Sequence, residues 1–206
     1  MADTILQVKD LAVSFASYAG KVQAVRNISF DLYRGETLAI VGESGSGKSV
    51  TTKAILGILP GNGTIESGEI LYNGADLAKF ADKDFESVRG KKISLVFQDP
   101  LSALNPIMKI GKQIMEALVP SKAATKGEAR ERALELMRRV GIPQPEIRFN
   151  QYPFQFSGGM RQRIVIAIAL ACNPEILICD EPTTALDVTI QAQILELINE
   201  IKDRNH

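Results

Sequence analysis

The chain has 206 residues, of which 45% are hydrophobic and 23% charged, and its 24 basic side chains balance 24 acidic ones. These proportions are those of an ordinary globular domain, and they exclude disordered, collagen-like and coiled-coil chains. The net charge of zero also argues against a protein that coats nucleic acid or an anionic membrane through bulk charge.

Short strands are predicted for the opening third of the chain. Apolar runs divided by polar residues predict strands at 5–8, 11–15, 24–25 and 28–32. The next run, Thr37–Val41, is continuously apolar, which is typical of a strand that a parallel sheet buries on both faces. A glycine-rich turn follows, and a helix is predicted from about residue 48 to 59, before Pro60.

Strands and helices alternate through the rest of the chain. Strands are predicted at 67–73, 93–97 and 176–179. Helices are predicted over 107–140 with interruptions at Gly111 and Pro120, from Ser157 to Cys172, and over 190–202, with a loop at 143–153. This alternation predicts an α/β fold with a mixed β region at its start.

Cysteine and histidine usage narrows the class of protein. Two cysteines and one histidine argue against a disulfide framework and against a metal site that needs several such ligands. Cys172 and Cys179 lie in apolar runs and are interpreted as small buried hydrophobic residues rather than a reactive pair. We find no signal-peptide pattern, and the longest apolar run, 164–172, is too short to span a membrane, so a soluble, cytoplasmic chain is expected.

One segment fits the phosphate-loop pattern G-x-x-x-x-G-K-[ST]; it reads Gly42-Glu43-Ser44-Gly45-Ser46-Gly47-Lys48-Ser49. It lies between a predicted buried strand and a predicted helix, where the glycines let backbone N–H groups surround a phosphate and the helix N-terminus adds positive charge. Lys48 would reach the β- and γ-phosphates, and the Ser49 hydroxyl would ligate Mg²⁺. We therefore predict a nucleotide phosphate loop rather than a structural glycine turn.

Two adjacent acids, Asp180 and Glu181, end the predicted strand at 176–179. That position is the carboxyl edge of the sheet, where open α/β folds bind ligands. Asp180 would hold Mg²⁺ directly or through water, and Glu181 would polarise the attacking water as general base. Acids at strand ends commonly only face solvent, so this prediction depends on the phosphate loop for its strength.

A second helix start has the features of an anion site. Ser157 is predicted to cap the helix, and Gly158 and Gly159 leave its first amides bare. One triphosphate rarely needs two such sites, which suggests that this one serves a nucleotide bound by another subunit. The alternative is an ordinary capped helix.

Together these motifs follow a recognisable order: the phosphate loop, Gln98, Ser157-Gly158-Gly159, Asp180-Glu181 and Ala185-Leu186-Asp187. The order resembles that of ATP-binding-cassette (ABC) ATPases over essentially the whole chain. Finer runs resemble the oligopeptide, dipeptide and nickel importer subgroup: Phe97-Gln98-Asp99-Pro100, Leu104-Asn105-Pro106, Tyr152-Pro153 and Phe156-Ser157-Gly158-Gly159-Met160-Arg161-Gln162-Arg163. Met160 stands where the wider family usually has glutamine, which we interpret as a trait of the subgroup.

The resemblance implies a P-loop NTPase core with a parallel sheet, an antiparallel β subdomain on the N-terminal side and an inserted helical subdomain. The ATPase domain would occupy 1–206, with the helical insert at 100–172. The family places a switch histidine after one more strand, so the domain is expected to be incomplete at its C-terminus. His206 is interpreted as a terminal surface residue and not as that switch.

The resemblance also implies ligands and roles. ATP and Mg²⁺ would bind in a head-to-tail dimer with a second ABC ATPase subunit, identical or paralogous, with Ser157, Gly158 and Gly159 facing the partner's γ-phosphate. Gln98 would sense Mg²⁺ and the water, and its loop would contact a transmembrane subunit. Asp187 would line the dimer seam. Phe15 is chosen as the aromatic that stacks on adenine, with Tyr18 as the alternative.

The expected function is that of the ATPase subunit of an importer for di- and oligopeptides, peripheral at the cytoplasmic face of the inner membrane. Its partners would be two transmembrane permease subunits and, indirectly, an extracytoplasmic substrate-binding protein, with no nucleic acid. The alternatives are a nickel or metallophore importer, a soluble non-transport ABC ATPase, and a module that uses ATP only to dimerise. A soluble ABC ATPase is expected to show a coiled-coil insert or a second cassette, and this sequence has neither.

Overall fold

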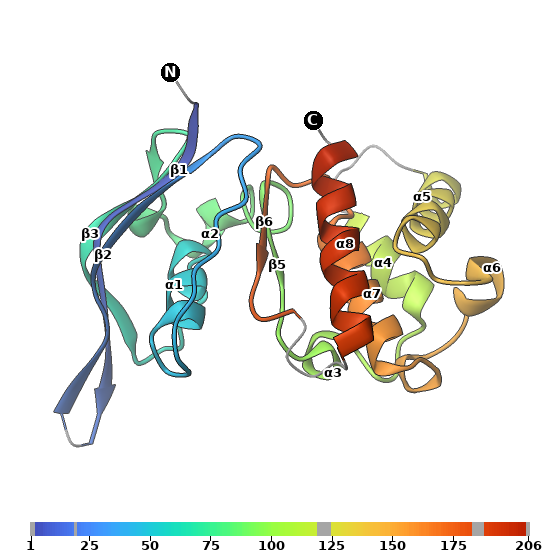
Figure 1. Ribbon diagram of the computed structural model, residues 1–206, viewed down its shortest axis with the longest axis horizontal. Helices are drawn as coiled ribbons and strands as arrows, with labels where there is room; N and C mark the ends of the chain where they lie inside the picture. The colour runs from blue at the N-terminus through green and yellow to red at the C-terminus, as the bar shows by residue number, and fades with distance from the viewer. Residues whose placement is uncertain (1–2, 19, 119–124, 183–187, 205–206) are drawn as a thin grey trace. The chain divides into compact units, whose positions relative to one another are not determined.

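The computed structural model describes residues 3–18, 20–118, 125–182 and 188–204. The chain divides into two compact units, Met1–Val88 and Arg89–His206, whose elements are drawn in Figure 1. Each unit is described by itself. Residues 100–172, the predicted helical insert, lie within the second unit. That they form a separate subdomain remains a prediction.

An antiparallel sheet organises the first unit, with strand order β2-β1-β3-β4. Its strands are β1 (Thr4–Ser17), β2 (Gly20–Tyr33), β3 (Gly63–Tyr72) and β4 (Ala75–Asp76). The four short strands predicted before residue 33 are thus two long ones. Asp10 and Asn27 adopt positive φ angles of 47° and 49° beside shifts in the β1–β2 register, so the polar breaks in the sequence are bulges rather than turns.

Helix α1 (Lys48–Ile55) contacts both β1 and β2 and buries Ala54 and Ile55. The short elements η1 (Leu77–Lys79) and α2 (Asp82–Phe85) complete the unit. The α1 helix starts at the predicted residue and ends earlier than predicted, with Leu56 as its C-cap.

The expectation of a buried strand at Thr37–Val41 is wrong for this unit. Residues 37–41 form no helix or strand, and Val41 is 89% exposed. A strand exists only through hydrogen bonds to a neighbour, and no strand described in 3–18 and 20–88 pairs with this segment. An apolar run indicates that a segment is suited to burial, but it does not show whether a neighbouring strand is available to pair with it.

The second unit combines two parallel strands with helices. Strands β5 (Ile93–Val96) and β6 (Ile176–Cys179) pair from Ile93 with Ile176 to Val96 with Cys179. The helices are α3 (Pro100–Ala103), α4 (Ile110–Leu118), α5 (Lys126–Arg139), α6 (Pro145–Arg148), η3 (Pro153–Gln155), α7 (Gly158–Ala169) and α8 (Val188–Arg204). Short helices therefore occupy the predicted loop at 143–153.

The core of the second unit follows the predicted apolar pattern at α5 and departs from it at Gly111. Ala133, Leu136, Met137 and Val140 are fully buried, as their spacing predicts. Gly111 does not interrupt a helix: it lies in the first turn of α4, and a Cβ there would stand 2.3 Å from the Phe149 ring. A close approach of two segments, rather than a break, explains this glycine.

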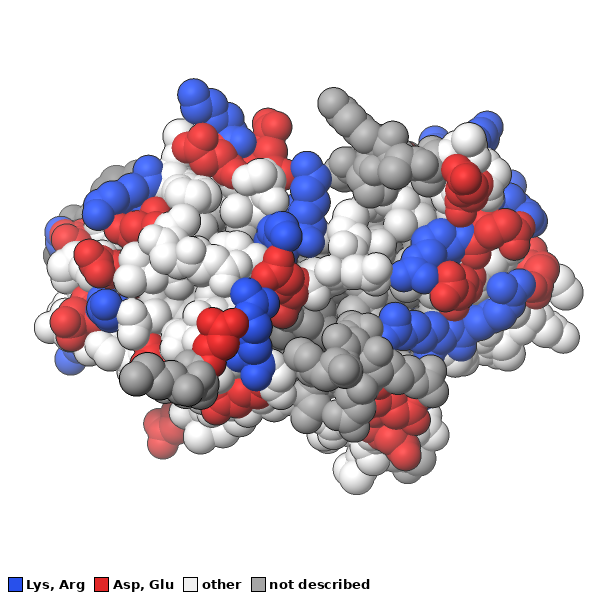
Figure 2. All heavy atoms as spheres, turned by 90° about the horizontal axis from the view of Figure 1, so that it is seen from above, with Lys and Arg blue, Asp and Glu red and all other residues white. Residues whose placement is uncertain are grey.

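Basic and acidic side chains are interspersed on the face that Figure 2 shows, in keeping with the zero net charge. None of the helices in the described residues is both long enough and apolar enough to cross a membrane.

Candidate functional site

Two glycines with positive φ shape the phosphate loop in the first unit. Gly45 has φ 81° and Gly47 has φ 96°, angles that residues with a side chain rarely adopt. Gly47 is also the N-cap of α1, without any side-chain cap. A Cβ at Gly47 would stand 2.7 Å from the Ala24 carbonyl oxygen of β2. The sheet thus fixes where the loop enters the helix, and Gly47 offers no side chain that could cap the helix.

The Lys48 ammonium group lies across this loop. Its Nζ donates hydrogen bonds to the Gly42 carbonyl at 2.8 Å and to the Glu43 carbonyl at 3.0 Å. The loop also closes on itself, because the Ser46 amide donates to the Glu43 carbonyl at 3.1 Å. The positive charge and the N-terminus of α1 therefore lie at the same loop, an arrangement that suits a phosphate group. Ser49 follows in the first turn of α1.

The predicted adenine aromatics differ in their surroundings. Phe15 is half-buried in β1, opposite Val22 of β2 and Gly63 of β3. A Cβ at Gly63 would stand 2.7 Å from the Phe15 ring, so the ring occupies the space of the missing side chain. Tyr18, the alternative, is fully exposed.

The sheet also relates Phe15 to the phosphate loop. Gly47 abuts Ala24 and Val25, and Phe15 is paired with Val22 of the same strand. Phe15 and the phosphate loop thus lie next to positions of β2 that are only a few residues apart, Val22 and Ala24–Val25.

Gln98 and Glu181 meet in the second unit. Gln98 Nε2 donates a hydrogen bond to Glu181 Oε2 at 3.0 Å. The Asp180 amide donates to the Val96 carbonyl at 3.0 Å, which extends the β5–β6 pairing to the first acid. Glu181 then takes a positive φ of 46°, which is uncommon for a residue with a side chain and is a feature that clusters at functional sites. No pattern in the neighbouring residues indicates this conformation.

Ser157 caps α7 as predicted. Its Oγ accepts a hydrogen bond from the Met160 amide at 3.4 Å, and Phe156 before it is buried, so the chain enters the helix at a fixed angle. Ser157 and Gly158 are exposed and Gly159 is half-buried. The Arg161 side chain points back and donates from Nε to the Pro153 carbonyl at 2.8 Å, a contact that the motif itself does not indicate.

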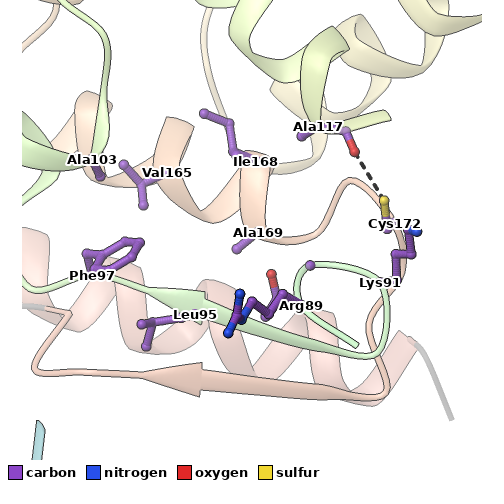
Figure 3. Close-up of a pocket in the computed structure, with 12 residues that line it drawn as sticks. Arg89, Lys91, Leu95, Phe97, Ala103, Ala117, Val165, Ile168, Ala169 and Cys172 are labelled. Carbon is purple, nitrogen blue, oxygen red and sulfur yellow. Dashed lines mark hydrogen bonds between the residues drawn. The ribbon is translucent and has the colours of Figure 1, made fainter. Parts of the chain in front are cut away.

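Both cysteines are free, and burial raises the pKa of each thiol. For Cys179 the pKa rises to about 12. Cys172 donates from Sγ to the Ala117 carbonyl at 3.1 Å, beside a cavity of about 250 Å³. Figure 3 shows Phe97, Ala103 and Val165 at one end of this cavity, with Lys91 and Cys172 at the other. Both side chains are partly exposed, so they are less buried than the sequence interpretation expects, while the raised pKa of each thiol disfavours a reactive thiolate.

The donor types are those that Mg²⁺ prefers. Ser49 offers a hydroxyl, Gln98 an amide oxygen and Asp180 a carboxylate, all hard oxygen ligands. Among the described residues, no group of three or more His, Cys, Asp or Glu side chains could hold a metal ion. Each of these donor types suits an ion that takes its remaining ligands from substrate phosphates and water.

The structure therefore groups the predicted residues into three local assemblies. The first assembly, in the first unit, is the loop at 42–49 together with Phe15. The second assembly, in the second unit, is the cluster of Gln98, Asp180 and Glu181. The start of α7 is the third. Ala185, Leu186 and Asp187 lie outside the described residues.

The matching family profile and two relatives with similar sequences point to the same family of proteins. The profile of the "ABC transporter" family matches residues 25–184. The oligopeptide transport ATP-binding protein OppD of Bacillus subtilis is 58% identical over 201 residues, which are 97% of this chain and 56% of that protein. The dipeptide transport ATP-binding protein DppD of Lactococcus lactis is 57% identical, over 98% of this chain and 58% of its own length. The chain thus spans little more than half the length of these relatives.

Solved structures also match. A dimeric ATP-binding cassette in a post-hydrolysis state, bound to ADP and Pi, superposes with a TM-score of 0.85 at 28% identity, covering 97% of this chain and 84% of that one. The dimeric structure of a bacterial ABC transporter cassette gives a TM-score of 0.83 at the same identity and coverage. These similarities confirm the expected α/β fold of P-loop ATPase cassettes.

Proposed function

The chain belongs to the ABC transporter family, and on that premise we propose that it binds and hydrolyses ATP to energise the import of di- and oligopeptides. The sequence motifs of this chain and the names of its relatives support this activity, and we propose it for the whole protein. It places the protein peripherally at the cytoplasmic face of the membrane.

The observation that carries the proposal is the geometry of the phosphate loop. Lys48 Nζ lies across the loop that leads into the N-terminus of α1, and Gly47 has neither the φ nor the space for a side chain. Such a loop binds phosphate through fixed amides and a single charge, which is how P-loop NTPases hold the β- and γ-phosphates. Phe15, reached along the same sheet, is the proposed adenine contact.

Hydrolysis is assigned to the Gln98–Glu181 cluster. Glu181 accepts the proton of the attacking water as general base. Gln98 holds one carboxylate oxygen by the hydrogen bond at 3.0 Å, which limits the orientations of the Glu181 side chain. Ser49, Asp180 and Gln98 would hold Mg²⁺, which when bound neutralises charge that develops on the transferring phosphoryl group.

The exposed start of α7 is proposed to act on a partner's nucleotide. Ser157 and Gly158 are exposed at the N-terminus of a helix of 12 residues, where positive charge favours an anion. The matched cassettes are dimers, which supports a head-to-tail pair with a second ABC ATPase subunit.

Peptides are the proposed cargo because the relatives at 57–58% identity are named for oligopeptide and dipeptide transport. The relatives' names favour peptides over nickel or a metallophore. Two transmembrane permease subunits and an extracytoplasmic binding protein complete the proposed importer.

Reconstitution tests the proposal. The full-length protein, assembled with its permease subunits and a peptide-binding protein in liposomes, should hydrolyse ATP faster when peptide is added, and nickel should have no such effect. ATP hydrolysis that responds to nickel but not to peptide would contradict the cargo assignment. Failure to bind ATP at all would contradict the proposal as a whole.

A further inference from the structure

A buried glutamine at the start of α4 clamps the segment that follows Gln98. Gln113 is 7% exposed, and its side chain makes three hydrogen bonds to the main chain. Its Oε1 accepts from the Asn105 amide at 2.9 Å. Its Nε2 donates to the carbonyls of Asn105 at 3.0 Å and Met108 at 2.8 Å. Three of the four hydrogen bonds that the amide can make thus go to one short stretch of backbone.

The stretch between Gln98 and this clamp has little freedom. Asp99 caps α3 by accepting from the amides of Leu101 at 2.9 Å and Ser102 at 3.2 Å. Leu104, next to Asn105, is buried. A short capped helix, the buried Leu104 and the Gln113 hydrogen bonds thus tie residues 99–108 to α4.

The same turn of α4 is bonded to the segment that leads into α7. The Ile110 amide donates to the Gln151 carbonyl and the Gly111 amide to the Phe149 carbonyl, each at 2.9 Å. The Phe149 ring fills the space above Gly111. From there Arg161 bonds the Pro153 carbonyl to the first turns of α7. The first turn of α4 is therefore bonded both to the segment that follows Gln98 and to the segment that leads into α7.

We propose that Gln113 is a positioning residue that fixes Gln98 relative to α4 and, through α4, to the helix start at Ser157. The inference rests on the proposed function, because the proposed function gives Gln98 and the helix start at Ser157 their roles in ATP hydrolysis. The hydrogen bonds of Gln113 go to Asn105 and Met108, so it acts on Gln98 and Ser157 only through the backbone between them. Its effect is to stop the backbone after Gln98 from moving independently of the helix that also holds the approach to Ser157.

Substitution of Gln113 by Met tests this, because Met keeps the length and burial of the side chain and removes all three hydrogen bonds. In the full-length protein, hydrogen exchange at the Asn105 amide should accelerate at least about tenfold, since its acceptor is lost. The Gly111 amide, which bonds to Phe149, should keep its protection. In the assembled transporter kcat should fall about tenfold, with KM for ATP within about twofold of wild type, as expected when positioning rather than nucleotide binding is lost.

Leu136→Val is the matched control. Leu136 is fully buried on α5, so this variant lowers the stability of the same unit without touching the clamp. It should lower Tm while kcat and Asn105 protection stay near wild type.

Unchanged exchange at Asn105 in Q113M, or an equal loss of kcat in the control at the same Tm, would overturn the inference. A wild-type transporter that hydrolyses no ATP would instead contradict the proposed function and with it the role toward Gln98. The exchange measurement would still decide whether Gln113 clamps the segment.

Discussion

Gln98 Nε2 donates to Glu181 Oε2 at 3.0 Å, although the two residues are 83 positions apart in the chain. The pairing of β5 with β6 produces this contact, because parallel strands end at the same edge of a sheet. The positive φ of Glu181 turns the chain directly after Asp180. Two adjacent acids can therefore serve different tasks, one toward a cation and one toward water.

Glu181→Gln should preserve ATP binding and lower turnover by about 10²–10⁴, the usual contribution of a general base. Glutamine keeps the size of the side chain and removes its ability to accept a proton. Steady-state hydrolysis by the full-length protein measures the effect. Glu175→Gln is the control, since Glu175 pairs with Lys92 at 2.6 Å near the opposite end of the strands, and its turnover should stay near wild type. Wild-type turnover in E181Q would remove Glu181 from the mechanism.

Gln98→Ala should lower kcat about tenfold or more while KM for ATP changes little, because the orientation of Glu181 is lost and the phosphate loop is intact. Gln7→Ala provides a control that loses a comparable bond elsewhere, from Gln7 Nε2 to Asp31 at 2.8 Å. Equal kcat losses in the two variants would show that the Gln98 contact has no specific role.

The sequence predicted the site-bearing elements best where a local rule was sufficient. The N-cap at Ser157, the start of α1 at Lys48 and the strand before Asp180 each follow from a few neighbouring residues. The roles of these residues in ATP hydrolysis stay predictions.

Features that depend on distant partners escaped sequence analysis. The bulges at Asp10 and Asn27 resemble turns until the β1–β2 register is known. Gln113 reads as one more polar residue on a helix, because its three backbone partners are visible only in the fold. Thr37–Val41 shows the converse case, in which a strong strand pattern finds no pairing partner within its unit.

Gly47→Ala should weaken ATP binding and destabilise the first unit. The new Cβ would meet the Ala24 carbonyl at 2.7 Å and the backbone would hold φ 96°, at a cost of about 1–3 kcal/mol from the backbone conformation before the clash is counted. Gly45→Ala is the matched variant, because its φ is 81° with nothing within 4 Å. Thermal unfolding should place G45A between wild type and G47A, and equal unfolding temperatures for the two variants would contradict the packing argument.

Cys179 should resist alkylation in the folded protein. Burial raises the pKa of its thiol to about 12, so at pH 8 only about one thiol in 10⁴ is the reactive thiolate. Labelling with iodoacetamide should be slow at pH 8, accelerate as the pH approaches the raised pKa, and become fast in urea. Fast labelling of Cys179 in the native protein at pH 8 would contradict the raised pKa of its thiol.

The most direct test of the account is the ATP affinity of this chain with and without the Lys48 ammonium group, measured by calorimetric titration. The wild-type chain should bind ATP, and Lys48→Ala, which removes the charge beside the Gly42 and Glu43 carbonyls, should bind it at least about tenfold more weakly, as expected for a lost charge-assisted contact. A folded wild-type chain that binds no ATP, or a K48A variant with unchanged affinity, would contradict the phosphate-loop assignment on which the proposed function depends.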